Sequence, residues 1–267
     1  MAPRAVWLLL WFTGLGCHPF ALVNEGAEPS RAVELWEKGQ AAMRDGHPGE
    51  AVDFYAQSLA ADPTMVRNHL SLAAAYLDLG DDAQACPHLA HYVAAQPDHL
   101  SIRLHYAELL VRLHQGKKAR QEFEQFVVGA QEQGEPFDRN LIHCHSQLME
   151  IAESEDDAYN EHLNRGIGLY LLARERAELP EIEGALSAEG LLCKAAGELT
   201  LACEQRPDEA RPCWYLSLVW SCLAQQQLEL RWLRLADAAA PFSYLTAVEK
   251  RQLSLACLQR LTPTICK

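Results

Sequence analysis

Helix-like segments, each ended by a proline or by a turn signal, follow one another along most of the chain. Prolines close such segments at Pro63, Pro97, Pro207 and Pro241. Stretches rich in glycine and aspartate separate the helical segments that lie between them. No stretch sustains the alternation of apolar and polar residues that predicts a β-strand. The pattern therefore predicts an all-α fold of about twelve helices.

A fixed period underlies these segments. Pro97 follows Pro63 at the same distance at which Pro241 follows Pro207, and this distance of about 34 residues is a known period of helical repeat proteins. Repeats set at 32–65, 66–99 and 100–133 bring residues of similar size into register: small ones at Gly39, Ala73 and Ala107 and at Ala51, Ala85 and Ala119, bulky ones at Tyr55, Leu89 and Phe123. A small side chain where two antiparallel helices cross lets their backbones approach, and a bulky one fills the adjoining gap.

Because of this period and the small and bulky residues in register, residues 32–133 resemble three units of the tetratricopeptide repeat (TPR) family. The resemblance implies a right-handed α-solenoid of stacked helix pairs. Residues 191–243 resemble degenerate TPR units, and 244–267 resemble a capping helix, at 244–262, with a tail. The central and C-terminal part also resembles uncharacterised exported or lipoprotein-type TPR proteins of planctomycete bacteria, a likeness that implies no activity.

An irregular middle interrupts the repeats. Pro207 follows Pro97 after three whole periods and eight further positions. We therefore predict an irregular helical insertion over 134–190. It comprises two helices, at 139–154 and 158–178. They are flanked by two helix-breaking segments, at Gly134–Phe137 and Pro180–Gly184.

In TPR stacks the first helix of each pair lines the concave groove in which ligands bind. The resemblance assigns this role to mainly apolar residues: Val33, Trp36, Gln40, Met43, Arg67, Leu70, Ala74, Leu77, Ser101, Leu104, Glu108 and Val111. The cationic clamp by which some TPR domains hold acidic chaperone tails is absent, because the matching positions are Trp36, Gln40, Ser71, Ser101 and His105. We therefore expect a protein or peptide partner with an apolar or amphipathic segment, anchored by Trp36. Alternatively, the groove residues contact another part of the same chain.

Residues 1–17 are typical of a bacterial export signal. Arg4 precedes an uncharged apolar run, and small residues follow up to Cys17. The run is shorter than the roughly 20 residues that cross a bilayer core. The tetrapeptide ending in Cys17 resembles a lipobox, although the family pattern prefers an aliphatic residue where Gly14 stands. Lipidation at Cys17 with a membrane tether, cleavage by ordinary signal peptidase and an uncleaved start are the open alternatives, and 18–31 is a predicted linker.

Charge and composition narrow the choice of partner. The chain has 23 Lys and Arg against 36 Asp and Glu, a net charge of −13, which argues against nucleic acid as a ligand. With 49% apolar residues, the composition is that of an ordered globular protein. Together with the N-terminal segment, these features predict a TPR scaffold or adaptor of the bacterial cell envelope.

The nine cysteines show no metal-binding spacing. None forms a Cys-x-x-Cys pair, so no metal site is expected. Disulfides between Cys203 and Cys213 or Cys222, and between Cys222 and Cys257, are geometrically conceivable in adjacent helices. The alternative is that these residues are buried thiols that act as small apolar side chains.

Catalysis has no support among the sequence motifs. There is no GxSxG elbow, P-loop or dinucleotide fingerprint, so neither catalytic residues nor a cofactor is expected. The alternative to a non-catalytic adaptor is a divergent enzyme or accessory subunit with a polar site in the irregular middle. That site would bring His143, His145 and His162 together with Glu150 or Glu161.

Overall fold

The computed structural model describes residues 30–134, 139–179 and 186–261, and these residues form twelve α-helices and no β-strand. The helices are α1 (Arg31–Arg44), α2 (Pro48–Ala61), α3 (Val66–Asp78), α4 (Asp82–Ala95), α5 (Leu100–Arg112), α6 (Gly116–Gln133), α7 (Arg139–Ser154), α8 (Ala158–Ala177), α9 (Ala188–Gln205), α10 (Ala210–Cys222), α11 (Gln226–Ala239) and α12 (Ala247–Arg260). The prediction of an all-α fold with about twelve helices is confirmed. The predicted export signal at 1–17, with Cys17, and most of the predicted linker lie outside the described residues.

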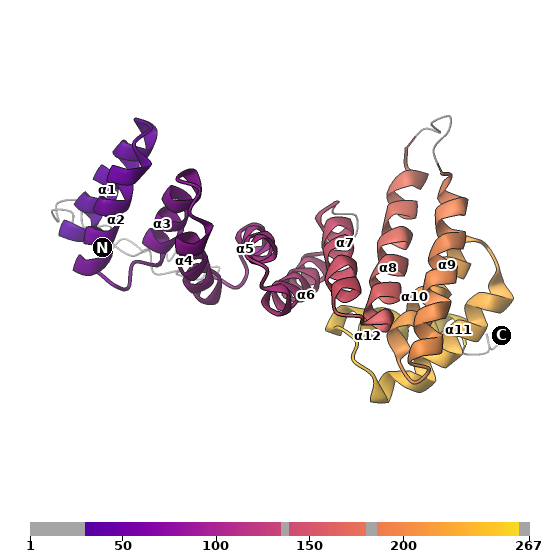
Figure 1. Ribbon diagram of the computed structural model, residues 1–267. Coiled ribbons are helices and arrows are strands. Elements are labelled where there is room, and N and C mark those ends of the chain that lie inside the picture. The colour runs from indigo at the N-terminus through magenta and orange to yellow at the C-terminus, as the bar shows by residue number, and fades with distance from the viewer. Residues whose placement is uncertain (1–29, 135–138, 180–185, 262–267) are drawn as a thin grey trace, which may run out of the picture.

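The helices pack in pairs, in the manner of TPR units. α1 packs on α2, α3 on α4, α5 on α6, α7 on α8 and α10 on α11, and each pair also packs on a neighbouring pair. In Figure 1 the N-terminal pairs stand at one end of an elongated molecule, and α8 to α12 gather at the other. Stacking is required because a single helix hairpin cannot bury its own apolar face.

The same backbone turn joins the two helices of each of these five pairs. Each turn holds one residue with positive φ, namely Gly46, Gly80, His114, Asp156 or Ala224, with φ between 55° and 78°. The N–H of the following residue donates to the carbonyl five residues earlier, at 2.8–2.9 Å. This is the hydrogen bond of a Schellman motif, which satisfies a carbonyl that the ending helix leaves without a partner.

The turn residues locate the eight surplus positions of the chain. Gly46, Gly80 and His114 follow one another at one period each, whereas Asp156 follows His114 after one period and eight further positions. Ala224 then follows Asp156 after two whole periods. The surplus over the period therefore lies between His114 and Asp156. Within the predicted insertion, α7 and α8 form a hairpin like those before it, with bounds close to the predicted 139–154 and 158–178.

Helix α8 takes part in two hairpins. It packs on α7 and on α9. The period predicts a positive-φ turn near position 190, but the described residues there contain no residue with positive φ. Gly190 instead lies in the first turn of α9. A Cβ on Gly166 would lie 2.6 Å from Leu199 Cγ, and a Cβ on Gly39 would likewise overlap the Tyr55 ring. α8 therefore meets α9 through the same close approach by which α1 meets α2.

The positions that the period brings into register form the core. Tyr55, Leu89, Phe123, Leu199 and Leu233 occupy one register position, and each is at most 3% exposed. They belong to three successive core clusters, the first around Tyr55, the second around Phe123 and the third around Leu199. The third, which runs from α8 to α12, extends the apolar core through the C-terminal helices.

The C-terminal helix α12 begins later than the predicted capping helix. A short 3₁₀ helix (Ala240–Phe242) ends the preceding repeat, and α12 starts after Thr246 rather than at 244. Thr246 and Glu249 form a capping box, in which each side chain accepts the backbone N–H of the other, at 3.1 and 2.8 Å. This reciprocal capping defines the first residue of α12.

The glycines of the α8–α9 hairpin allow a matched test of the close approach. We expect Gly166→Ala to destabilise the protein by roughly 1–3 kcal/mol, because the added methyl enters space filled by Leu199. Gly197→Ala, on the open side of α9 with nothing within 4 Å of its Cβ, should instead stabilise by roughly 0.5–1 kcal/mol through helix propensity. Urea unfolding of both variants measures the difference, and equal shifts would contradict the tight approach.

Candidate functional site

An open apolar groove lies between two consecutive first helices, α3 and α5. It has a volume of about 370 Å³. Its lining comprises Leu70, Ala74, Leu77, Leu89, Ile102, His105, Glu108, Leu109 and Arg112. Polar groups stand only at its rim, where Arg112 donates to both carboxylate oxygens of Asp82 at 2.7 and 2.9 Å. This cavity, the α3–α5 groove, contains Leu70, Ala74, Leu77 and Glu108 of the predicted groove residues.

The equivalent space between α1 and α3 is closed by the chain's own side chains. The indole N–H of Trp36 donates to Ser71 Oγ at 2.9 Å, and Gln40 Nε2 donates to Ser71 Oγ at 3.2 Å and to Tyr55 Oη at 2.8 Å. The Arg67 guanidinium lies 4.4 Å from the centre of the Trp36 ring. Trp36, Gln40 and Arg67 thus hold α1 to α3, and Met43 packs beside them against the first core cluster.

The period explains why one groove is filled and the next is open. In the repeat register Leu70 corresponds to Trp36, Ala74 to Gln40 and His105 to Ser71. The shorter Leu70 and Ala74 cannot reach across to α5 as Trp36 and Gln40 reach across to Ser71. The open space between α3 and α5 follows from these two smaller side chains.

Of the α5 wall of the α3–α5 groove, the sequence prediction included only Glu108. The prediction took one face of each first helix, and on α5 that face includes Leu104, which is 7% exposed and lies in the second core cluster. Beside Glu108, the α5 wall is formed by Ile102, His105, Leu109 and Arg112. Their spacing of three, four and three residues marks the helix face that points back toward α3 and was the signal available in the sequence.

A second, more enclosed cavity is lined by α6, α7, α8, the start of α10 and the segment before α12, and it is mainly polar. This polar cavity has a volume of about 250 Å³. Its polar lining comprises Glu124, Gln125, His145, Tyr159, Asn160, Asn164, Arg206, Glu209, Arg211, Tyr244 and Thr246. The segment before α12 borders this cavity through Thr246. Thr246 Oγ1 also donates to Gln131 Oε1 of α6 at 2.8 Å, across a separation of 115 residues in the chain.

Buried ion pairing holds α12 in this place. Glu249, only 3% exposed, accepts hydrogen bonds from Arg211 at 2.8 and 3.0 Å and from the Tyr215 hydroxyl at 3.2 Å. Burial is the main cause that raises the pKa of Tyr215, and the nearby Glu249 carboxylate raises it further. Tyr215 therefore stays protonated and donates to Glu249. The charges of the Arg211–Glu249 ion pair thus have hydrogen-bond partners.

His145 of α7 lines the polar cavity and is buried. Burial lowers its pKa to about 4, although the hydrogen bond with Asn164 acts in the opposite direction. His145 Nδ1 lies 2.9 Å from Asn164 Oδ1, and Asn164 Nδ2 donates to the Asn160 carbonyl at 2.8 Å. Because Asn164 Oδ1 can only accept, Nδ1 carries the proton of the neutral ring. At neutral pH His145 is an uncharged, buried donor.

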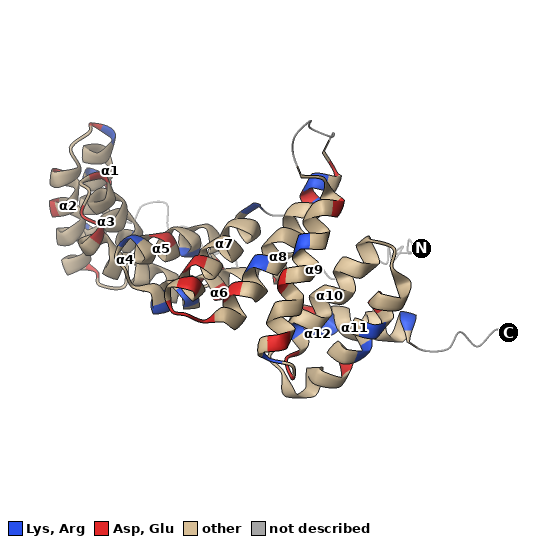
Figure 2. Cartoon of the chain, turned by 45° about the vertical axis from the view of Figure 1, so that its right-hand side comes forward, with Lys and Arg blue, Asp and Glu red and all other residues tan. Residues whose placement is uncertain are grey.

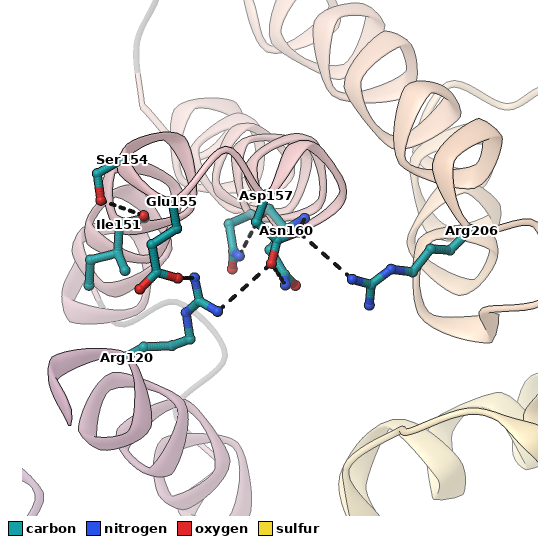
Figure 3. Close-up of polar contacts among 8 residues, drawn as sticks. Arg120, Ile151, Ser154, Glu155, Asp157, Asn160 and Arg206 are labelled. Carbon is teal, nitrogen blue, oxygen red and sulfur yellow. Dashed lines mark hydrogen bonds and ion pairs between the residues drawn. The ribbon is translucent and has the colours of Figure 1, made fainter. Parts of the chain in front are cut away.

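A network of charges joins three helices at the edge of the polar cavity. Figure 3 shows Arg120 of α6 and Arg206, the residue after α9, directed toward Asp157, the N-cap of α8. Each guanidinium has a nitrogen 3.8 Å from a carboxylate oxygen of Asp157. Burial alone would raise the pKa of Asp157, but hydrogen bonds from Asn160 and the two arginine charges lower it. The carboxylate therefore remains ionised and links the three helices.

The histidine cluster that an enzyme would need does not form. His143 is exposed and lies 3.1 Å from Glu108, and His162 lies 2.8 Å from Glu198. Glu161 pairs with Arg165, and Glu150 is exposed on α7 beside Gln147. Only His145 of the five predicted residues lines the polar cavity.

Charged residues of both signs occur along the chain. Figure 2 marks acidic and basic residues on the N-terminal as well as the C-terminal helices. Within residues 30–134, 139–179 and 186–261, no group of three or more His, Cys, Asp and Glu could hold a metal ion. Nor is any helix of that part long and apolar enough to cross a membrane.

Comparison with known proteins relates the chain to solved TPR structures at low similarity. A crystal structure of MamA is 11% identical, with a TM-score of 0.40, over 89% of this chain and 99% of that one. The Sgt2 TPR domain from Aspergillus fumigatus is 18% identical, with a TM-score of 0.37, over 60% and 93%. YrrB, described as a TPR protein with an unusual peptide-binding site, is 15% identical, with a TM-score of 0.34, over 85% and 92%. No protein-family model and no curated protein matches the chain.

The buried His145 makes the fold sensitive to acid. Its pKa is about 4 in the folded state and about 6.5 in an unfolded chain. The unfolded state therefore binds the proton first as the pH falls, and we expect a loss of about 3 kcal/mol of stability between pH 6.5 and 4. Unfolding free energies measured across this range test the slope.

Two histidine variants separate this effect from the rest of the acid response. His145→Gln keeps a donor for Asn164 but does not titrate, so its stability should depend less steeply on pH. His143→Gln, which changes an exposed histidine, should retain the wild-type slope. His69 and His88, whose pKa values are also lowered by burial, act in the same direction and keep some slope in both variants. An unchanged slope in His145→Gln would contradict the assignment.

Proposed function

We propose that the protein is a non-catalytic scaffold or adaptor that binds an apolar or amphipathic peptide segment in the α3–α5 groove. The observation that carries this proposal is the open apolar space between two first helices, lined by Leu70, Ala74, Leu77 and Ile102. Between α1 and α3 the corresponding space is closed by Trp36, Gln40 and Ser71. A groove that the chain does not fill itself is suited to a partner's side chains.

The rim of the α3–α5 groove favours an amphipathic partner over a purely apolar one. Glu108, Arg112 and His105 present charged or polar atoms beside the apolar floor. Glu108 and Arg112 are already paired, with His143 and Asp82, so their contribution to affinity is modest. Apolar burial against α3 and α5 would then supply most of the binding energy, and Trp36, Gln40, Met43 and Arg67 would continue the surface toward α1.

A non-catalytic role is favoured over an enzyme because the polar cavity lacks a reactive constellation. His145 is neutral and committed to Asn164, and Arg211 is committed to Glu249. His143 and His162 are paired elsewhere. The groups of the polar cavity therefore resemble the interior of a structural junction, with no nucleophile paired to a base.

Filling the α3–α5 groove tests the proposal. The protein is panned against a displayed peptide library, and the enriched peptides are measured by isothermal titration. Ala74 is exposed in the groove. Ala74→Arg should therefore lower the affinity for these peptides at least 10-fold, which is about 1.4 kcal/mol of binding free energy. The helical circular dichroism should be unchanged. The matched control Ala94→Arg places the same charge on an exposed site of α4 outside the groove and should bind normally.

Salt and a second variant distinguish an apolar site from a charged one. Binding should persist at about 0.5 M salt, because screening weakens contacts between exposed charges far more than apolar burial. Trp36→Ala should reduce affinity if the site extends to α1. Enriched peptides that bind Ala74→Arg as tightly as wild type, and lose binding in salt, would place the site on a charged surface instead.

We also propose that the protein is exported to the bacterial cell envelope and tethered to the membrane by lipid on Cys17. The support is the N-terminal segment, with Arg4, an apolar run and small residues up to Cys17. Ser30 caps α1, with its side chain accepting the Val33 N–H. The chain between Cys17 and Ser30 would then separate the helical stack from the bilayer.

Replacing Cys17 tests the proposed localisation independently of the peptide-binding site. Wild-type protein made in a bacterium with lipoprotein processing should fractionate with membranes, and its mature N-terminus should be a lipid-modified Cys17. Cys17→Ala should appear in the soluble fraction, because the acyl chains supply the membrane affinity. A native N-terminus downstream of residue 17, or membrane retention of Cys17→Ala, would contradict lipidation at this residue.

A further inference from the structure

Two cysteines from consecutive helices are in contact at the junction between α9 and α10. Cys203 lies two residues before the end of α9, and Cys213 is the fourth residue of α10. Their sulfur atoms are 3.6 Å apart. A disulfide bond is about 2.05 Å long, so closure requires the two sulfurs to approach by about 1.5 Å. Side-chain rotation and a small shift of either helix can supply a movement of this size.

The backbone around the two cysteines is fixed in place. Ser243 Oγ accepts the Ala210 N–H at 2.8 Å and donates to the Asp208 carbonyl at 2.9 Å, which ties the connection to the segment before α12. Ala202 and Ala210 are fully buried on either side of that connection. Cys213 is 4% exposed within the third core cluster, and Cys203 packs at the edge of that cluster. The thiols are therefore held together by the fold and do not meet by chance motion of a loop.

We propose that Cys203 and Cys213 form a disulfide that cross-links α9 to α10 when the protein meets a thiol–disulfide oxidant. The two residues are ten apart, so the bond would close a short loop across a boundary between neighbouring hairpins. On one side stand α8 and α9, and on the other α10 and α11 with the attached α12. In a stack where each unit contacts only its neighbours, such a bond strengthens the junction that keeps the C-terminal helices together.

The unequal environments of the two sulfurs suggest the order of the exchange. Cys203 is partly exposed whereas Cys213 is buried, so an oxidant reaches Cys203 first. The hydrogen bond with Cys213 and burial raise the pKa of Cys203, so its loss of a proton limits this step. The Cys203 thiolate then attacks a disulfide of the oxidant, which joins the oxidant to Cys203 and releases one thiolate. Cys213 then attacks the Cys203 sulfur and releases the second thiolate. The hydrogen bond from Cys203 lowers the pKa of Cys213, as does a position in the first turns of a helix. In sum, two protein thiols are oxidised, two protons are released or transferred and one oxidant disulfide is reduced.

Peptide mapping of the native protein tests the pairing. The purified full-length chain is reduced, equilibrated with oxidised and reduced glutathione, alkylated with N-ethylmaleimide and digested without reduction. We expect a cross-linked peptide joining Cys203 to Cys213 in wild type, and the same peptide in the controls Cys193→Ser and Cys222→Ser, which change exposed cysteines. Cys213→Ser should accumulate glutathione on Cys203, because the thiol that resolves the mixed disulfide is missing.

Thermal unfolding tests the consequence of the bond. Oxidised wild type should unfold about 5 °C or more above the reduced protein, because the cross-link restricts the unfolded chain. In Cys203→Ser the two conditions should give the same midpoint. Free alkylation of both cysteines after equilibration, a cross-link to a different cysteine, or equal midpoints for oxidised and reduced wild type would each overturn the proposal.

Discussion

The fold depends on the close approach of antiparallel helices at positions where a side chain is nearly absent. At Gly39 the Tyr55 ring occupies the space of a Cβ, and at Gly166 the Leu199 side chain does the same. Such contacts let two helices bury their apolar faces without a third layer, since protein interiors tolerate few voids. The Schellman turns at Gly46 and its equivalents hold each helix pair in the geometry that this approach requires.

The shared helix α8 changes how the C-terminal half is built from these contacts. Because α8 packs on both α7 and α9, α8 is the second helix of one hairpin and the first helix of the next. The phase of the repeat is nevertheless kept. The C-terminal helices gather beside α7 (Figure 1), and the start of α12 reaches Gln131 of α6. The same segment lines the polar cavity through Tyr244 and Thr246.

The polar groups of that junction contribute to specificity more clearly than to net stability. Glu249 and Tyr215 are buried and the Arg211 side chain is 22% exposed, so the attraction between Arg211 and Glu249 must offset a desolvation cost. Removal of one partner would leave a buried charge, at about 3–5 kcal/mol. His145 adds a neutral donor that must stay uncharged. These requirements favour one placement of α12, whereas apolar contacts alone would allow several.

The repeat period and the identity of the core residues were readable from the sequence, because both are local and periodic. The spacing of prolines and small residues predicted the helix pairs, the bounds of α7 and α8 and the buried register of Tyr55, Leu89 and Phe123. Four residues that line the α3–α5 groove were among the predicted groove residues: Leu70, Ala74 and Leu77 on α3 and Glu108 on α5. The other α5 residues of the lining show the limit of a family register that marks one face of each helix.

Only the tertiary structure decided which inter-helix spaces are filled and which segments meet across the chain. Trp36 reaches Ser71 and fills the space between α1 and α3, whereas the short Ala74 leaves a gap between α3 and α5. Each outcome depends on the length of the side chain relative to the distance between the helices. The sharing of α8 and the contact of Thr246 with Gln131 depend on the summed orientations of seven helices, from α6 to α12. A local sequence pattern does not specify how these orientations add up along the chain. The period therefore determined the repeating unit, and the accumulated packing angles determined the polar cavity and the contact between Cys203 and Cys213.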